Sequence, residues 1–433
     1  MIPFDMVNEK IRKSLEITTS YGKVHTLKDH LLISKGPICQ IGDVCEVGES
    51  ILSEVLAIQN NHVYLLPFDG ADAVQAGDKV KKVHHPIQLP PVEQLLGRVL
   101  NGFGQPIDED RELDAGEPLT LYRKSVGAMK RRMIEQPIET GIRVIDGLLT
   151  IGEGQRIGIF AGTGVGKSTM LGMVATNTQS DVNVIALIGE RAREVKEFIY
   201  KNLGEEGMKR SVVIVATSEE SPLKQIKSLL LATTIAEQFR DKGKKVLLMV
   251  DSITRFAMAK RELDVAAGEI IQAGGKTPSI EPAMQKVLER AGMGEVGSIT
   301  GIYTVLVEND DFEAPIPDMA RGILDGHIVL NRKLADQNHF PAIDILASIS
   351  RVMEAVVTEE HWKLSRTLKK YYSIYKENEE MFRIGTYIKG MDEEVDKARE
   401  LYPYIQELLK QETKESDTLD NVILKMKELL HEV

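Results

Sequence analysis

The amino-acid sequence predicts a multidomain α/β protein with an N-terminal β-barrel, a central α/β domain with a mostly parallel sheet, and a C-terminal helical bundle. Three observations support this fold class. Short strand-like runs follow one another closely up to residue 90, and from about 92 to 350 apolar runs alternate with helical segments. From residue 361 the sequence is rich in charge, and its apolar positions recur at helical spacing.

The composition limits the classes of protein to which the chain can belong. Its 433 residues correspond to about three domains of roughly 150 residues each. The net charge of −11 disfavours nucleic acid as a partner, because an acidic surface repels phosphate backbones. Two cysteines, Cys39 and Cys45, are too few for a disulfide scaffold and fit a reducing compartment. The apolar runs are far shorter than the ~20 residues of a membrane-spanning helix, and the N-terminus lacks the core of a secretory signal. We therefore expect a soluble cytosolic protein.

Residues 1–20 are predicted to form an amphipathic helix. Phe4, Val7, Ile11 and Leu15 are spaced by three or four residues, which places them on one face of a helix. That face can pack on the chain's own domain, or it can dock onto a partner or an acidic membrane surface. The pattern alone slightly favours the first interpretation.

Residues 21–90 are predicted to form the small β-barrel. The runs 21–33 and 38–47 are each interpreted as one strand, and the runs 55–58 and 63–66 flank a hairpin turn at Gln59 to His62. A proline-marked junction from His84 to Pro91 ends this domain. We expect both cysteines to be ordinary residues of the barrel.

The central domain is predicted to span residues 91–355. Five short runs rich in valine, isoleucine and leucine are interpreted as strands, and segments between them, such as 168–178 and 223–240, have helical periodicity. Such a pattern is typical of a parallel sheet that helices cover on both faces. The predicted strands are Ile157 to Phe160, Val184 to Ile188, Ser211 to Ala216, Val246 to Asp251 and Ile302 to Val307. The helical domain is predicted to follow at residues 356–433.

The strongest functional motif is AGTGVGKS, which begins at Ala161 and lies between a predicted strand and a predicted helix. This is the arrangement of a P-loop, the phosphate-binding element of RecA-like domains, with alanine in place of the first glycine. The backbone N–H groups of such a loop and the start of the next helix are suited to phosphate oxygens. We therefore predict a nucleotide site. Its residues are Gly162, Thr163, Gly164, Val165, Gly166, Lys167, Ser168 and Thr169.

The same region predicts the chemistry of ATP hydrolysis with Mg²⁺. Lys167 is expected to reach the β- and γ-phosphates, and the hydroxyl of Ser168 to bind the metal. Asp251 ends a buried strand, where a carboxylate beside the P-loop strand can hold the shell of the metal. Glu190 and Arg191 end another strand. Glu190 can act as a general base toward water, and Arg191 can stabilise charge on the phosphoryl oxygens. Alternatively the two form a surface ion pair that caps the next helix, and position alone favours neither interpretation.

Several longer motifs resemble the ATPases of type III protein export. Besides AGTGVGKS, they include ALIGERAREVKEFI, VLLMVDSITRFAMAKRE, GSITGIYTVLVENDD and FPAIDILASISRVM. Two further segments, LLGRVLNGFGQPID and QPIETGIRVIDGLLTIGEGQRIGIF, resemble what this family shares with the catalytic subunits of rotary ATP synthases. The resemblance covers nearly the whole chain from about Tyr21. The segments 202–227 and 383–398 are most similar to the flagellar branch, and the virulence-associated (injectisome) branch is a close second.

This resemblance implies an Mg²⁺-dependent ATPase that energises protein export as a homohexameric ring at the cytoplasmic face of the inner membrane. Glu190 falls on the catalytic glutamate of the family, Arg191 on the neighbouring phosphate-contacting arginine and Asp251 on the aspartate of the magnesium shell. Arg255 falls on the arginine of the DSxTR motif, and Arg351 on an arginine finger that reaches the nucleotide of the adjacent subunit. Because such a finger acts in trans, an isolated subunit is expected to be a poor catalyst.

The family also implies partners. They are a central stalk protein in the channel of the ring, a regulatory protein at the N-terminal helix, membrane proteins of the export gate and chaperone-bound cargo. One segment, GEIIQAGGKTPSIEPAMQ, departs from the family pattern, with Ile270 and Ile271 in place of a proline pair and Lys276 in place of an aromatic residue. This departure bears on how the ring contacts its stalk and leaves the nucleotide chemistry unchanged.

Three other classes of protein are alternatives to an export ATPase. A catalytic subunit of a rotary proton pump would require a second type of ring subunit. A helicase-like nucleic-acid motor is disfavoured by the acidic charge, and a non-catalytic scaffold is disfavoured by the intact motif residues. For the adenine ring the sequence offers Tyr371, Tyr372 and Tyr375. An aromatic cluster in a helical domain is more often part of the core.

Overall fold

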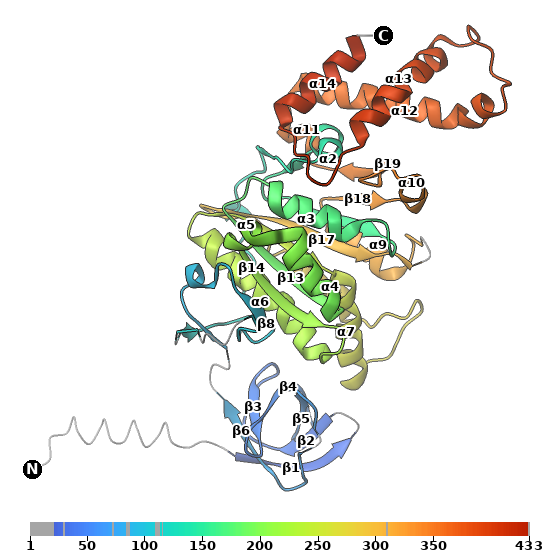
Figure 1. Ribbon diagram of the computed structural model, residues 1–433. Helices are drawn as coiled ribbons and strands as arrows, with labels where there is room; N and C mark the ends of the chain where they lie inside the picture. Colours follow the sequence, from blue (N-terminus) through green and yellow to red (C-terminus); the bar gives the residue numbers. More distant parts are fainter. Residues whose placement is uncertain are drawn as a thin grey trace, which may run out of the picture.

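The chain folds into a barrel, a central sheet domain and a group of helices, which follow one another in sequence order (Figure 1). The computed structural model describes residues 21–28, 31–71, 73–83, 87–108, 113–114, 116–308 and 311–431. The helix predicted for residues 1–20 lies outside this part of the chain, as do residues 84–86 of the predicted junction. Among the helices that are described, none is long and apolar enough to cross a membrane. The predicted fold class is confirmed.

Six strands close into the N-terminal barrel in the order β1-β2-β5-β4-β3-β6. They are β1 (Tyr21–Lys28), β2 (Leu31–Lys35), β3 (Val44–Val47), β4 (Ile51–Gln59), β5 (His62–Pro67) and β6 (Lys79–Val83). The hairpin between β4 and β5 turns at Asn60 and Asn61, whose φ angles are 49° and 62°. Two left-handed residues match the twist of the flanking strands, so the predicted hairpin is confirmed. The side chain of Cys45 is buried in the barrel core.

Two strand predictions in the barrel were too long. The run 21–33 contains β1 and the start of β2, which are two separate strands paired antiparallel with each other. In the run 38–47 only the last four residues are a strand. Ahead of it the chain turns at Gly42, whose φ is +89°, and the carboxylate of Asp43 accepts a hydrogen bond of 2.7 Å from the backbone N–H of Gln40. This local bond competes with strand pairing.

The central domain contains a sheet of nine strands in the order β19-β18-β12-β17-β15-β13-β14-β8, with β16 paired to β17. Only β19 and β16 are antiparallel to their neighbours, so the sheet is mostly parallel, as predicted. Its strands are β8 (Val99–Asn101), β12 (Arg156–Ala161), β13 (Val182–Glu190), β14 (Ser211–Thr217), β15 (Lys245–Asp251), β16 (Gly292–Met293), β17 (Ser298–Leu306), β18 (Gly326–Leu330) and β19 (Ile343–Ser350). The five apolar runs interpreted as strands include none of β8, β16, β18 and β19.

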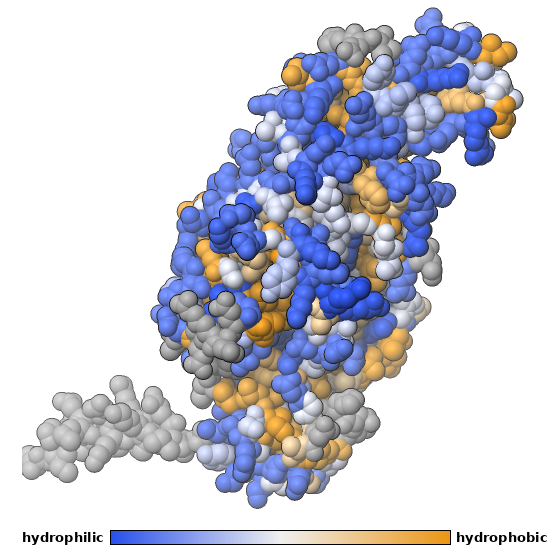
Figure 2. All heavy atoms as spheres, viewed as in Figure 1, coloured by the Kyte–Doolittle hydropathy of each residue, from blue (hydrophilic) through white to orange (hydrophobic). Residues whose placement is uncertain are grey.

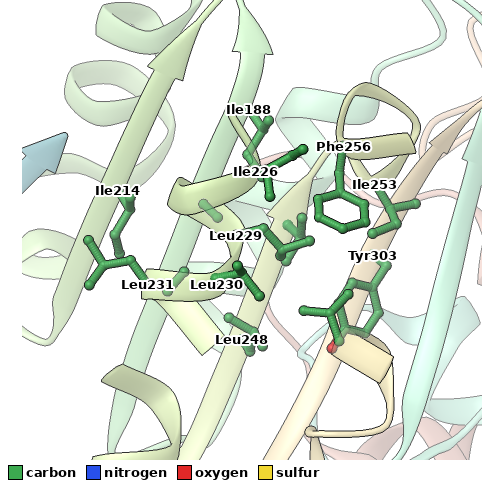
Figure 3. Close-up of a cluster of buried hydrophobic side chains, with 14 of the residues drawn as sticks. Ile188, Ile214, Ile226, Leu229, Leu230, Leu231, Leu248, Ile253, Phe256 and Tyr303 are labelled. Carbon is green, nitrogen blue, oxygen red and sulfur yellow. The ribbon is translucent and has the colours of Figure 1, made fainter. Parts of the chain in front are cut away.

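Helices cover both faces of this sheet (Figure 1). One face carries α3 (Lys167–Asn177), α4 (Ala192–Glu197), the π-helical turn η3 (Phe198–Leu203) and α5 (Gly204–Lys209). The other carries α6 (Pro222–Asp241), α7 (Ile253–Ala266) and α9 (Pro315–Ile323), with α8 (Ile280–Leu288) beside them. Figure 3 shows Ile226, Leu229 and Leu230 of α6 packed toward Ile188 and Leu248 of the sheet. Each such fully buried side chain contributes about 1.5–3 kcal/mol.

Short elements connect the barrel to the sheet. They are β7 (Gln88–Leu89), η1 (Val92–Leu95), β9 (Glu117–Pro118), η2 (Ala128–Lys130), β10 (Pro137–Ile138), α2 (Arg143–Leu148) and β11 (Ile151–Gly152). The barrel is held to α6 by a buried ion pair, in which Lys227 Nζ lies 2.5 Å from Glu54 Oε2. The hydroxyl of Tyr122 donates a hydrogen bond of 3.0 Å to the other oxygen of Glu54. Figure 2 shows apolar side chains gathered where the barrel meets the central domain.

The C-terminal helices pack on the central domain through α2. They are α11 (Met353–Val356), α12 (Glu359–Arg383), α13 (Glu393–Leu409) and α14 (Leu419–His431). A further short helix, α10 (Arg332–Asp336), belongs to the central domain and connects β18 to β19. Leu401, Ile405, Val422 and Met426 belong to the same buried cluster as the apolar side chains of α2. A side chain at Gly147 of α2 would approach Val422 to 2.8 Å, so the two helices are in close contact. The helices and the P-loop side of the sheet therefore share one core.

The turn before α2 is held by a buried carboxylate, and this gives a first prediction. Asp146 accepts hydrogen bonds from the Thr140 N–H (2.9 Å), the Thr140 hydroxyl (2.7 Å) and the Gly141 N–H (2.8 Å). Asp146→Ala leaves these buried donors without a partner, so we expect the free energy of unfolding to fall by about 2–4 kcal/mol. Urea unfolding at pH 7 measures this change. Asp336→Ala, at an exposed position of α10, is the control and should stay within about 0.5 kcal/mol of the wild type. Equal midpoints for Asp146→Ala and the wild type would contradict the prediction.

Candidate active site

The predicted P-loop connects β12 to α3 at the C-terminal edge of the sheet. Gly164 and Gly166 have φ angles of +79° and +87°, a region that glycine enters without steric cost. Ala161 is still part of β12 and pairs with Leu306 of β17, so this position does not require the first glycine of the motif. The loop is braced by Arg332, whose Nη2 donates a hydrogen bond of 3.3 Å to the carbonyl of Thr163.

Three of the predicted site residues meet beside this loop. Lys167 Nζ lies 2.5 Å from Asp251 Oδ1 and 3.3 Å from Glu190 Oε1. They come together because β12, β13 and β15 are parallel strands, whose C-terminal ends lie at one edge of the sheet. A register shift between Ile188 and Glu190, at Gly189 with φ +69°, forms a bulge at the end of β13. Such a bulge re-aims the side chain that follows it.

The charges in this cluster depend on one another. Burial raises the pKa of Asp251 and of Glu190, and the ammonium of Lys167 opposes the rise in both. Burial alone would lower the pKa of Lys167, but the facing carboxylates outweigh it and the pKa is raised. Lys167 is therefore charged, because two carboxylates face a single ammonium. Its ammonium contacts both acids.

The remaining residues predicted near the phosphates are arranged differently. Ser168 and Thr169 lie on the first turn of α3 with exposed side chains. The side chain of Arg191 is 79% exposed, and its Nη1 lies 3.7 Å from Glu194 Oε1. Arg191 thus pairs with Glu194 and not with Glu190, the partner that the alternative interpretation gave it, and the carboxylate of Glu190 lies beside Lys167 instead. The side chain of Arg255, on α7, packs against the end of β13. A Cβ atom added at Gly189 would lie only 2.6 Å from Cγ of Arg255.

Arg351 lies away from the P-loop of its own chain. It follows β19, whose last residue, Ser350, pairs with Gly326 at the start of β18. Because β18 runs parallel to β12, the start of β18 lies at the end of the sheet opposite to the P-loop. Measured along the strands, Arg351 is about four residues, or roughly 13 Å, from the end of β12 at which the P-loop begins. The guanidinium of Arg351 donates hydrogen bonds to the carbonyls of Leu324 (3.3 Å) and Arg321 (3.2 Å). The structure does not bring this residue to Lys167.

A cavity of about 810 Å³ lies beside the P-loop, between α3 and the end of α13. Its lining includes Gly166, Met173, Phe340, Pro403, Gln406 and Gln411. The ring of Phe340 would lie 3.4 Å from a side chain at Gly166, so it is next to the phosphate loop. The three tyrosines named from the sequence are absent from this lining. Tyr375 stacks on Tyr402 with ring centroids 3.4 Å apart, and Tyr372 is buried in the core.

Phe340 lies beside the P-loop and was not predicted from the sequence as a site residue. The available signal was an aromatic residue directly before a proline in FPAIDILAS, ahead of an apolar run. That signal is weak, because only the fold brings residue 340 next to Gly166.

The donor set at the P-loop fits Mg²⁺ that arrives with a nucleotide. Within the described part of the chain, no three His, Cys, Asp or Glu side chains form a metal site of their own. Mg²⁺ commonly keeps several waters and binds through one or two carboxylates together with substrate phosphates. Asp251 and the hydroxyl of Ser168 supply oxygens of this kind next to the phosphate loop.

The fold and the site define a P-loop ATPase domain. In agreement, residues 141–350 match the profile of the ATP synthase alpha/beta family, nucleotide-binding domain, and residues 357–428 match that of the T3SS EscN ATPase C-terminal domain. The chain is 44% identical to the flagellum-specific ATP synthase of Bacillus subtilis, over 96% of this chain and 98% of that protein. It is 45% identical to the SPI-2 type 3 secretion system ATPase of Salmonella typhimurium, over 95% of each. The chain belongs to the family of flagellum-specific and type III secretion ATPases.

Solved structures of this family have the same fold. The assembled ATPase EscN from the type III secretion system of enteropathogenic E. coli superposes with a TM-score of 0.90 at 43% identity, over 94% of this chain and 100% of that one. EscN in complex with its central stalk EscO superposes with a TM-score of 0.88 at 42% identity, with the same coverage. The protein is therefore an ATPase of type III export that uses a nucleotide as its substrate.

Proposed function

We propose that this ATPase energises flagellar protein export as a homohexameric ring with Mg²⁺ as its cofactor. The observation that carries the proposal is the cluster of Lys167, Glu190 and Asp251 at the P-loop, in a chain similar over nearly its full length to flagellum-specific ATP synthases. The injectisome branch is the second candidate, because its relatives are equally similar. A rotary proton pump is less favoured, since residues 357–428 match a type III secretion domain.

The arrangement of the cluster suggests a separate role for each of its residues during ATP hydrolysis. When ATP binds, Lys167 leaves the two carboxylates and pairs with the β- and γ-phosphates. Asp251 and Ser168 are then free to hold Mg²⁺, which when bound neutralises charge on the phosphate oxygens. Glu190, released from its counter-ion, accepts a proton from the attacking water. Arg191 moves from its exposed pair with Glu194 toward the phosphoryl oxygens.

The position of Arg351 supports action between subunits. Because it lies about 13 Å back along the sheet from its own P-loop, it can stabilise the reacting phosphate only in a neighbouring subunit. We infer that this chain forms a ring as the family does. The assembled EscN and its complex with the stalk EscO support a ring and a central stalk partner here as well. The regulatory protein at residues 1–20, the export-gate proteins, the chaperone-bound cargo and a location at the cytoplasmic face of the inner membrane are proposed from the family resemblance.

Specific ATPase activity, measured with Mg²⁺ against protein concentration and alongside the oligomer mass, tests the ring. We expect activity per subunit to rise cooperatively as a hexamer appears. Equal activity per subunit from monomer to ring would contradict the trans arrangement. Disruption of the gene in its host separates the two branches. Loss of flagellar filaments supports the flagellar role, whereas intact filaments with lost effector secretion support the injectisome role.

The cavity beside the P-loop is proposed to hold the adenine ring, with Phe340 stacked on it. Phe340→Ala is then expected to raise KM for ATP about 10-fold with little change in kcat, because a stacked base is worth about 1–3 kcal/mol. Steady-state kinetics measure this effect. Tyr375→Ala, which removes an aromatic ring that stacks on Tyr402 away from the cavity, is the matched control. The assignment is wrong if Tyr375→Ala raises KM and Phe340→Ala does not.

A further inference from the structure

Thr304 carries a buried hydroxyl in the centre of the sheet. Its strand, β17, lies between β12, which leads into the P-loop, and β15, which ends at Asp251. Thr304 pairs with Ile159 of β12, and its side chain is 0% exposed. Ile302, on the same face of β17, belongs to the apolar core under α3. Burying a hydroxyl in such surroundings costs free energy unless it is hydrogen-bonded, so the bond that it makes is informative.

The hydroxyl of Thr304 is bonded to the aspartate of the site. Its Oγ1 donates a hydrogen bond of 2.6 Å to Asp251 Oδ1. Lys167 Nζ contacts the same oxygen at 2.5 Å. Short bonds to a charged acceptor are among the stronger ones in proteins. Asp251 is therefore held at Oδ1 from two directions, by a long flexible side chain on α3 and by a short one on a central strand.

These two contacts differ in what happens when nucleotide binds. In the proposed mechanism Lys167 moves to the phosphates, so its bond to Oδ1 is lost. Thr304 has one side-chain torsion that places its hydroxyl. Its backbone pairs with Ile159 of β12, and the residue before it, Tyr303, pairs with β15 on the other side. The hydrogen bond from Thr304 to Oδ1 is thus the one that persists when nucleotide is bound and Asp251 faces the metal.

We propose that Thr304 is a positioning residue, whose hydroxyl holds Oδ1 of Asp251 so that Oδ2 stays turned toward the magnesium of bound MgATP. This inference rests on the proposed magnesium role of Asp251. Without the hydroxyl, the carboxylate is free to rotate about its Cβ–Cγ bond once Lys167 has left. Partners of this kind, which orient a metal-binding side chain, change metal affinity about 10- to 100-fold when they are removed.

The test uses a pair of variants that differ only in the hydroxyl, Thr304→Ala and Thr304→Ser. The affinity for the fluorescent nucleotide mant-ADP is measured by titration with saturating Mg²⁺ and again with EDTA. The ratio of the affinity with Mg²⁺ to the affinity with EDTA gives the factor by which the metal tightens mant-ADP binding. We expect Thr304→Ala to lose about 10- to 100-fold of this tightening, with an unchanged affinity in EDTA. Thr304→Ser should stay within about threefold of the wild type.

Two further variants separate this role from a purely structural one. Thr304→Val keeps the volume of the side chain and should behave as Thr304→Ala does, even if the smaller alanine destabilises the sheet. Thr233→Val is the matched control. Thr233 of α6 is 1% exposed and its hydroxyl donates a hydrogen bond of 2.8 Å to the Leu229 carbonyl, with no part in the P-loop cluster. The ratio of mant-ADP affinities with Mg²⁺ and with EDTA should be the same in Thr233→Val as in the wild type.

The possible results are distinct. The inference is overturned if Thr304→Ala and Thr304→Val keep the wild-type ratio, or if Thr304→Ser loses as much as Thr304→Ala. A wild-type protein whose mant-ADP affinity is the same with Mg²⁺ and with EDTA would instead overturn the magnesium role of Asp251, and this inference with it. A loss in Thr304→Ala and Thr304→Val that Thr304→Ser restores supports the positioning role.

Discussion

Glu190→Gln is expected to lower ATP turnover by at least about 100-fold while MgATP still binds. A positioned general base contributes roughly 10²- to 10⁴-fold to a rate, and glutamine keeps the shape of the side chain without accepting a proton. Glu190 ends β13 with its carboxylate 3.3 Å from Lys167 Nζ, at the edge of the sheet where the P-loop lies. Phosphate release measures kcat, and titration with a fluorescent ATP analogue measures binding.

The same substitution should leave nucleotide affinity unchanged or slightly tighter. In the free protein Lys167 pairs with two carboxylates, which compete with the phosphates for its ammonium. Glutamine at position 190 removes one of these competing charges, so less electrostatic energy is lost when Lys167 moves to ATP. Weaker ATP binding in Glu190→Gln would indicate that Glu190 holds the site together rather than acting on water.

Glu197→Gln provides the matched control for this prediction. It is the same chemical change about two helical turns further on, at a residue whose carboxylate lies 3.5 Å from the ammonium of the exposed Lys201. Surface pairs of this kind are worth about 0–1 kcal/mol, so we expect kcat within about threefold of the wild type. A near-normal kcat in Glu190→Gln would place the base elsewhere.

The parts of the site that the sequence predicts are those in which motif and strand end coincide. Lys167 follows a glycine-rich loop, and Asp251 ends an apolar strand, so parallel strands must bring them to one edge of the sheet. Phe340 and Thr304 gave no such signal, because they join the site through long-range packing. Residue 340 meets Gly166 across more than 170 positions of sequence, and Thr304 depends on the strand order of the sheet.

The fold, like the site, was predicted only in part. Among the elements that were not predicted are those whose conformation depends on their place at the sheet edge or on a single local contact. Buried parallel strands are continuous apolar runs, which the sequence shows plainly. By contrast β19 has an alternating pattern with exposed Leu346 and Ile349, as befits an edge strand, and it was not recognised. In the barrel, the turn at Gly42 depends on one hydrogen bond from the backbone of Gln40 to Asp43. A local contact of this kind overrides an apolar pattern that favours a strand.

Arg351→Ala is expected to lower the turnover of an assembled ring by at least about 1,000-fold, because an arginine finger contributes roughly 10³- to 10⁵-fold to phosphoryl transfer. The guanidinium is exposed and bonds to the carbonyls of Leu324 and Arg321, which leaves its positive charge available to a phosphate of another subunit. Phosphate release by rings of verified mass measures the effect. Arg366→Ala, at an exposed arginine of α12, should leave kcat near the wild-type value.

Mixed rings decide whether Arg351 acts between subunits. An Arg351→Ala subunit keeps an intact P-loop, and a Lys167→Ala subunit keeps an intact finger, so each homogeneous ring is inactive for a different reason. When equal amounts assemble at random, about one quarter of the interfaces in a head-to-tail ring combine a good P-loop with a good finger. Turnover should therefore recover to at most about a quarter of the wild-type rate per subunit. If mixed rings of full size stay as inactive as the parent variants, Arg351 acts within its own chain or only supports the start of β18. Recovery would require the finger to cross the interface, because about four residues of strand, roughly 13 Å, separate Arg351 from the P-loop of its own subunit.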